Sequence, residues 1–205
     1  MKQIGSSILD LTDLDLCIGC GVCAGICPAR IPSMYTNNNG ELRPILNSPC
    51  NGSCRKCTLV CPFLGLNPSE DDLAQSLFGR MSGRWTKELG FVCNTYVGHR
   101  NDPHRHQSAS GGLAGWVLEN LLHARLVDRA VCVVPTGDPE QLFAYEIISD
   151  SEKVRRSCGS AYYPVELTEV LRFIRENPGR YALTALPCVV KALRLGQKQD
   201  NVLKE

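Results

Sequence analysis

The sequence has no hydrophobic run long enough to cross a membrane and no long run of basic residues. A bilayer span needs about 20 mostly apolar residues, so no membrane span is expected. The net charge is +1 and the basic segments RWTK and VRRS are short and isolated, so nucleic acid is not an expected partner. With 205 residues, 43% of them hydrophobic and 21% charged, the composition is that of an ordinary soluble globular chain of one or two domains.

The N-terminal segment MKQIGSSILDLTDLDL also lacks an uninterrupted apolar core of signal-peptide length, and it carries three aspartates. Nothing in it suggests export, so we expect a cytoplasmic protein. The cytoplasm is reducing, and structural disulfides are rare there. The cysteines of this chain are therefore expected to serve another chemistry.

Cysteine is abundant, and eight of the twelve cysteines form two runs that each end in Cys-Pro. The first run contains Cys17, Cys20, Cys23 and Cys27, and the second contains Cys50, Cys54, Cys57 and Cys61. CIGCGVCAGICP has the bacterial ferredoxin spacing, and CNGSCRKCTLVCP differs from it by one lengthened spacer. The pattern predicts two [4Fe-4S] clusters.

In the ferredoxin pattern, three closely spaced thiolates hold one cluster and the fourth cysteine ligates the other cluster. This pattern assigns Cys17, Cys20, Cys23 and Cys61 to cluster 1. It assigns Cys50, Cys54, Cys57 and Cys27 to cluster 2. Pro28 and Pro62 fit because proline disfavours continuing the preceding helical turn.

Two alternatives are disulfides and one zinc ion in each run. We favour clusters because zinc sites usually present two separated CxxC pairs, whereas these runs are more closely spaced. The other cysteines share no close spacing and are interpreted as small buried hydrophobic residues: Cys93, Cys132, Cys158 and Cys188. Three loop histidines are interpreted as solvated rather than metal-binding: His99, His104 and His106.

The hydrophobic patterns divide the chain into a two-cluster module at residues 1–67, a connector at 68–90 and an α/β domain at 91–205. Ser69 and Asp72 predict a capping box at the start of a short connector helix. In the third part, helices are predicted near residues 113–126, 164–176 and 187–196, and residues 149–157 have the chemistry of a helix start. Strands are predicted at 127–135, 141–149 and 181–186.

Two helix starts are candidate cofactor cradles, because free backbone N–H groups and the helix dipole favour an anion or an electron-rich ring. The first is Ser108-Ala109-Ser110-Gly111-Gly112, and the second is Thr184-Ala185-Leu186-Pro187-Cys188. A helix cap without a ligand is the alternative interpretation of each.

The ferredoxin-type head, SASGG, VDRAV, CGSAYYPVEL and TALPCVVKAL occur in an order that resembles the coenzyme F-420 hydrogenase/dehydrogenase beta-subunit family. The resemblance covers almost the whole chain and implies a fold in which an α/β flavin-binding domain follows the two-cluster module. It implies FAD and [4Fe-4S] clusters as cofactors and a redox partner protein, either ferredoxin or a larger hydrogenase, dehydrogenase or reductase complex. The implied flavin contacts are Ser108, Ser110, Gly111, Gly112, Gly159, Ser160, Tyr162, Thr184, Pro187 and Cys188.

The chain departs from the sequence motifs of the family at three places. Ala161 replaces the usual lysine of a GSKY-like segment, Ala185 and Leu186 widen the turn before Pro187, and Val189 stands where glutamine is common. Arg100 or Arg105 could supply the missing positive charge, although exposed loop arginines are the simpler interpretation.

Family members typically continue beyond the TPC-like turn with a half that helps close the flavin pocket. This sequence stops soon after that turn, so it is expected to be either a shortened piece or a shortened natural subunit. In both cases we expect its flavin site to be incomplete and to be completed by a partner chain.

The resulting hypothesis is an oxidoreductase in which FAD exchanges hydride with a deazaflavin coenzyme or similar molecule and two clusters carry single electrons. The first alternative is a non-catalytic electron-transfer subunit that docks to a larger redox enzyme. A weaker alternative is a scaffold with structural clusters. No general acid or base is assigned, and the direction of electron flow is left open.

Overall fold

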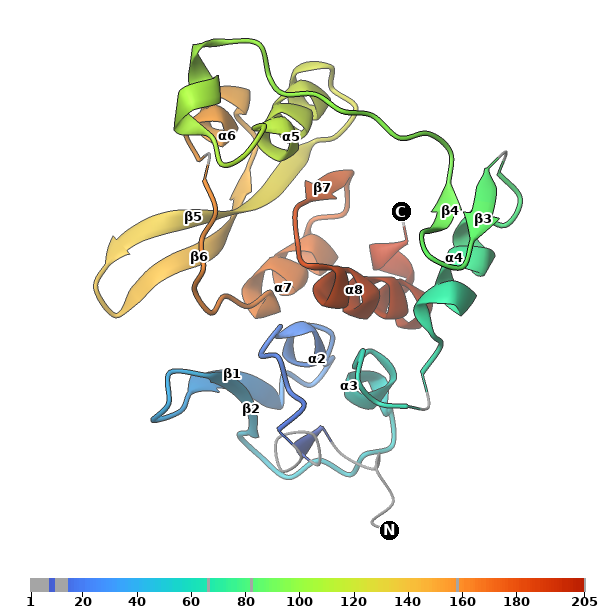
Figure 1. Ribbon diagram of the computed structural model, residues 1–205. Helices are drawn as coiled ribbons and strands as arrows, with labels where there is room; N and C mark the ends of the chain where they lie inside the picture. Colours follow the sequence, from blue (N-terminus) through green and yellow to red (C-terminus); the bar gives the residue numbers. More distant parts are fainter. Residues whose placement is uncertain (1–7, 10–14, 66, 82, 158, 205) are drawn as a thin grey trace.

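The computed structural model describes residues 8–9, 15–65, 67–81, 83–157 and 159–204 (Figure 1). Most of the N-terminal segment considered for export and the residue Cys158 lie outside the described residues. Within the described ranges, none of the helices combines the length and apolar character that a bilayer crossing requires.

The two cysteine runs lie on short helices and loops at one end of the molecule (Figure 1). Helix α2 spans Val22–Gly25 and helix α3 spans Lys56–Leu59, while strands β1 (Pro32–Thr36) and β2 (Leu42–Leu46) form an antiparallel hairpin. Gly21 precedes α2 with a φ of 74°, a left-handed conformation that glycine adopts without steric cost. The hairpin was not predicted from the sequence.

The connector contains a helix and a second small hairpin. Helix α4 spans Glu70–Phe78, and the predicted capping box is confirmed because Ser69 and Asp72 bond reciprocally. Strands β3 (Arg84–Thr86) and β4 (Gly90–Val92) pair antiparallel and were not predicted.

A three-stranded mixed sheet with the order β6-β5-β7 forms the other end of the molecule. Strands β5 (Arg129–Asp138) and β6 (Gln141–Ile148) pair antiparallel, and β7 (Tyr181–Leu183) joins the other edge of β5 in parallel. All three strands were predicted, although β5 extends further and β7 ends earlier. The mixed α/β class is therefore confirmed.

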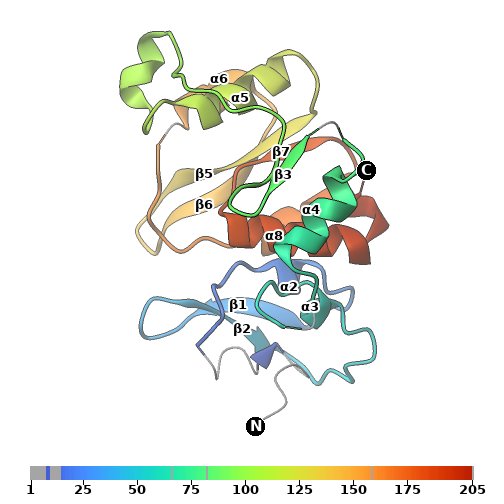
Figure 2. The same cartoon turned by 45° about the vertical axis from the view of Figure 1, so that its right-hand side comes forward.

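Helices cover this sheet and join it to the cysteine-bearing end. Helix α5 spans Leu113–His123 after the 3-10 turn η1 (Pro103–Gln107), and α6 spans Ser151–Arg156. The remaining helices are α7 (Thr168–Glu176), α8 (Pro187–Gln199) and the 3-10 turn η2 (Asn201–Leu203). Helices α7 and α8 lie between α2 and α3 on one side and the sheet on the other, as both views show (Figures 1 and 2).

Apolar residues at positions 113, 117, 118, 121 and 122 have a helical spacing that predicts one buried face, and α5 shows this face only in part. Leu118 and Leu122 are buried as expected, but Leu113 and Val117 are 42% and 45% exposed. Glu119 is buried instead, because two arginines bind its carboxylate. These ion pairs allow the Glu119 side chain to be buried, and the spacing of apolar residues alone does not predict this.

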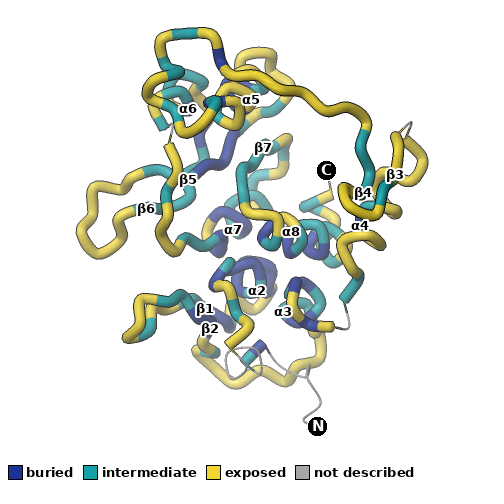
Figure 3. Tube along the Cα trace, viewed as in Figure 1, coloured by how far each residue is buried: buried dark blue, intermediate teal, exposed yellow. Residues whose placement is uncertain are grey.

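One hydrophobic core joins the cysteine-bearing helices to the rest of the chain. It contains Val22 and Ile26 from the first cysteine run, Val60 from the second, and residues of β5, α7 and α8. In Figure 3 the buried segments gather around α2, α3, α7 and α8. The core therefore packs α7 and α8 against the cysteine-bearing segments.

Candidate functional site

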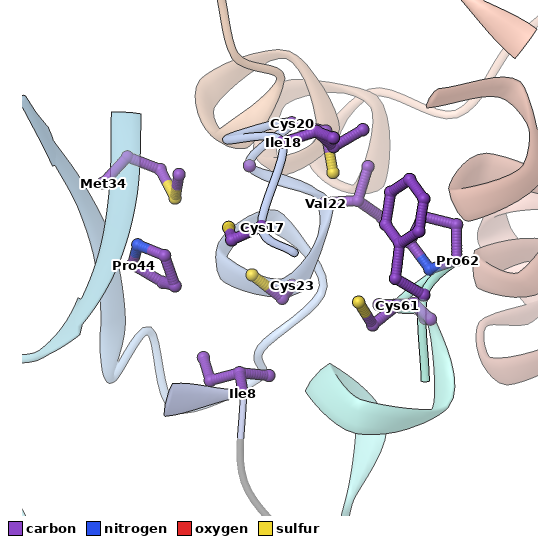
Figure 4. A pocket seen from close by; sticks show the side chains of 13 residues that line it. Ile8, Cys17, Ile18, Cys20, Val22, Cys23, Met34, Pro44, Cys61 and Pro62 are labelled. Carbon is purple, nitrogen blue, oxygen red and sulfur yellow. The ribbon is translucent and has the colours of Figure 1, made fainter. Parts of the chain in front are cut away.

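Four thiols from both cysteine runs line one cavity, and they are the four predicted for cluster 1: Cys17, Cys20, Cys23 and Cys61. Their sulfur atoms surround a common space (Figure 4). The other lining residues are almost all apolar: Ile8, Ile18, Gly21, Val22, Met34, Pro44, Val60, Pro62 and Phe63. The structure thus brings Cys61 to three thiols that lie more than thirty positions earlier in the sequence.

Hydrogen bonds to backbone carbonyl groups hold the first cysteine loop, which lines the cavity, on two sides. The buried Arg43 donates from Nη1 to the carbonyl oxygen of Cys17 at 2.6 Å and pairs with Glu41 at 3.0 Å. Leu167 donates its N–H to the carbonyl of Cys20 at 3.0 Å. These bonds tie the first cysteine loop to strand β2 and to the start of α7.

Burial dominates the electrostatics of three of these thiols, those of Cys20, Cys23 and Cys61. It raises the pKa of Cys20 to about 12, and the neighbouring Cys61 and Cys17 add to that increase. Burial also raises the pKa of Cys23 well above its usual value and raises that of Cys61. These three thiols ionise with difficulty, whereas coordination to a metal deprotonates a thiol outright. The donor set therefore fits a positively charged iron–sulfur group.

Three of the thiols predicted for cluster 2 lie within electrostatic reach of the fourth, Cys57. Burial raises the pKa of Cys57, and the charges of Cys54, Cys27 and Cys50 raise it further. Cys50 and Cys54 are exposed, whereas Cys27 is buried. The second set is thus more open to solvent than the first.

Among the described residues, no group of three or more His, Cys, Asp or Glu side chains could hold a single metal ion. The predicted loop histidines agree with a solvated role, since His99 and His106 are exposed and His104 is partly exposed.

The remaining cysteines divide between buried and exposed positions. Cys132 is buried, as predicted, and Cys188 is partly buried. The prediction is wrong for Cys93, which is exposed because the short β3–β4 hairpin leaves its following loop uncovered.

The SASGG segment leads into α5 as predicted, but no hydroxyl caps the helix. Gly112 occupies the position before the helix with a φ of 73°, and a Cβ there would meet Arg100 and Ser108 within 3 Å. The Ser108 hydroxyl donates to the carbonyl of His104 at 2.9 Å, and Ser110 is exposed. Gly111 accepts the N–H of Arg100 at 2.9 Å.

Arg100 does not offer its charge to a ligand, so the prediction that it could replace the missing lysine is wrong. Its guanidinium is fully buried, and its Nε donates to both Asp102 oxygens at 2.9 and 3.0 Å. It also donates to Glu119 at 3.1 Å, and Arg155 binds the same carboxylate. Arg100 therefore braces the SASGG segment from within the fold.

The other predicted flavin contacts fall into two groups. Gly159, Ser160 and Tyr162 are exposed, and the Tyr162 side chain is 96% exposed. Thr184 donates its N–H to the carbonyl of Val131 at 3.1 Å, and Pro187 begins α8 without a side-chain cap.

Cys188 is the predicted flavin contact that lies beside the thiol cavity. It packs against the core that also contacts Cys20 and Cys23, and its charge acts on the Cys20 thiol. The second predicted cradle thus ends near ligands predicted for cluster 1.

A second cavity is an open groove between β6 and α7, with Arg129, Arg172 and Glu169 among its lining residues. None of the ten predicted flavin contacts lines this groove or the thiol cavity.

Several residues that shape the site carry no short-range sequence signal. Arg43 reaches Cys17 from 26 positions away, and Lys191 of α8 influences the Cys61 thiol. Glu119 interrupts an apolar helix pattern, which is the one sequence feature that could have singled it out.

Comparisons with known protein families match two segments of this chain. Residues 95–172 match the family described as coenzyme F420 hydrogenase/dehydrogenase, beta subunit N-term. Residues 11–33, which include the first cysteine run, match the 4Fe-4S binding domain. The second run and the TALPC turn lie outside these two matches.

A curated relative is similar along nearly the whole chain. It is one of the subunits of the F(420)H(2) dehydrogenase of Methanosarcina mazei, 24% identical over 207 aligned residues. The alignment covers 95% of this chain and 52% of the relative. The chain thus spans about half the length of that protein.

Proposed function

Because this chain belongs to the coenzyme F420 hydrogenase/dehydrogenase beta-subunit family and carries a 4Fe-4S binding domain, we propose that it is a two-cluster iron–sulfur flavoprotein. In this proposal it passes electrons between FAD and two [4Fe-4S] clusters within a larger redox complex. The observation that carries the proposal is the cavity where Cys61 of the second run meets Cys17, Cys20 and Cys23 of the first.

The crossed thiol set supports two adjacent clusters rather than two separate zinc sites. In a cubane each thiolate binds a different iron, so its sulfur ligands surround a space instead of meeting at one point. The second set, with Cys27 near Cys57, has the reciprocal composition. Bound clusters supply one-electron chemistry, while the chain contributes the thiolates and an apolar wall that excludes water.

The flavin part of the proposal is supported by the helix starts. The N–H groups at the start of α5 receive no side-chain cap, and uncapped N–H groups at a helix start favour an anionic group such as a phosphate. The start of α8 is likewise uncapped by side chains, and Cys188 links it to the thiol cavity. FAD would supply hydride and single-electron chemistry, and these residues would orient it. The name of the curated relative supports a reduced deazaflavin as the organic partner.

A non-catalytic electron-transfer subunit is the second candidate. The exposure of Ser110, Gly159, Ser160 and Tyr162 favours it, since these predicted contacts line neither cavity. In that case the α/β part would serve to dock a larger redox enzyme.

Anaerobic purification followed by iron and flavin quantification on one sample separates the two candidates. The flavoprotein proposal predicts about one FAD together with about eight irons per chain. The same sample is then mixed separately with reduced deazaflavin coenzyme, reduced ferredoxin and a reduced nicotinamide. Bleaching of the flavin by one of them identifies the donor, whereas full iron without flavin contradicts FAD binding by these residues.

A further inference from the structure

An ion pair lies where α8 packs beside the thiol cavity. The Nζ atom of Lys191 is 3.1 Å from Oε1 of Glu70, the first residue of α4. The Lys191 side chain is 13% exposed, whereas that of Glu70 is 76% exposed. The cation is thus largely withdrawn from water, and its partner is not.

The packing of α8 fixes Lys191 near the ligands of cluster 1. Val189 and Ala192, on either side of it along the chain, are buried in the core that also contains Val60, the neighbour of Cys61. Cys188 precedes Lys191 by three residues, which places both on one face of the helix. Helix α8 also contacts α3, the helix of the second cysteine run, which ends two residues before Cys61. The packing therefore places α8, and with it the Lys191 charge, against the segment that supplies Cys61.

A cation largely withdrawn from water beside an iron–sulfur site favours the more negative, reduced form. Reduction adds one electron to the cluster, and local charge is one of the factors that set its potential. Charges near water are screened more strongly than charges in the interior. Glu70, being mostly exposed, therefore offsets only part of the effect of Lys191.

We propose that Lys191 raises the reduction potential of the cluster held by Cys17, Cys20, Cys23 and Cys61, and that Glu70 moderates this effect. Lys191 is a positioning charge in this proposal and touches no reacting atom. The inference rests on the proposed two-cluster function. It assigns α8 a second role, because the helix that begins at a predicted flavin cradle also adjusts the neighbouring cluster.

Anaerobic potentiometric titration followed by electron paramagnetic resonance tests the proposal. Lys191→Met keeps a long unbranched side chain but removes the charge, so we expect one of the two cluster potentials to become more negative. Glu70→Gln leaves Lys191 without its carboxylate partner, so the same potential should become less negative. Lys191→Arg should restore a value near that of the unaltered protein. Lys198→Met, an exposed change on the same helix, is the matched control and should shift neither potential.

Opposite shifts from Lys191→Met and Glu70→Gln would distinguish electrostatic control from a merely structural role. Unchanged potentials in a Lys191→Met protein with full iron would overturn this inference alone. Shifts of both variants in the same direction would overturn it as well. If Lys191→Met fails to fold, the exposed Glu70→Gln variant decides by the sign of its shift. An unaltered protein without clusters would instead contradict the proposed function, and this inference with it.

Discussion

Cys61→Ala is expected to remove the same cluster as Cys20→Ala, although the two residues belong to different cysteine runs. Each variant should retain about four irons, because one of two four-iron clusters loses a ligand. The physical reason is the shared cavity, where Cys61 joins Cys17, Cys20 and Cys23. Iron content and the electron paramagnetic resonance spectrum of the reduced protein measure the outcome. The remaining spectrum of Cys61→Ala should match that of Cys20→Ala.

The reciprocal variants complete this comparison. Cys27→Ala should match Cys54→Ala, because Cys27 lies near the thiols of the second run. Cys93→Ala changes an exposed cysteine outside both runs, so it should retain about eight irons. A Cys61→Ala spectrum that matches Cys54→Ala would mean that each run holds its own cluster, and the crossed assignment would be wrong.

Gly21→Ala is expected to lower the free energy of unfolding by about 3 kcal/mol, through backbone strain and overpacking together. The added Cβ would lie 2.0 Å from the Glu166 carboxylate and 2.9 Å from the backbone nitrogen of Leu167. The carboxylate can swing away, but the backbone that bonds Cys20 cannot shift without opening the cysteine loop. For a chain of this size the loss corresponds to a melting temperature lower by about 6–12 °C.

Gly40→Ala is the matched control in the same part of the chain. Gly40 has a φ of 78°, close to the 74° of Gly21, but a Cβ there would meet nothing within 4 Å. It should cost about 1 kcal/mol for the left-handed conformation alone. Thermal unfolding of both variants under anaerobic conditions, with iron determined beforehand, gives the comparison. Equal losses would show that the contact between the first cysteine run and α7 contributes little.

The sequence predicts the parts of the fold that depend on local patterns. Helix α7 follows from the spacing of Val170 and Leu171, and α4 from its capping box. Strands β5 and β6 follow from their apolar runs. These signals lie within a few residues of each other, so a single sequence contains them.

Features that depend on distant contacts could not be predicted in the same way. The β1–β2 hairpin contains proline in both strands, which weakens its local signal. Arg43 is buried because it bonds Cys17, and Glu119 is buried because it binds Arg100 and Arg155. In each case a partner far along the chain offsets the cost of burying a charge.

The same distinction applies to the candidate site. Cysteine spacing was sufficient to predict which four thiols line the shared cavity, because the ferredoxin pattern restricts the spacing of cluster ligands. The flavin contacts were predicted from family resemblance, and the structure brings Cys188 among them beside the thiol cavity. The influence of Lys191 on Cys61 required the packing of α8 on the cysteine-bearing helices.

Iron and acid-labile sulfide, measured together on anaerobically prepared protein, test most directly whether the two cysteine runs hold two clusters. Two [4Fe-4S] clusters predict about eight irons and about eight labile sulfides per chain. Zinc in place of iron, or iron without labile sulfide, would contradict the assignment of both runs as cluster ligands.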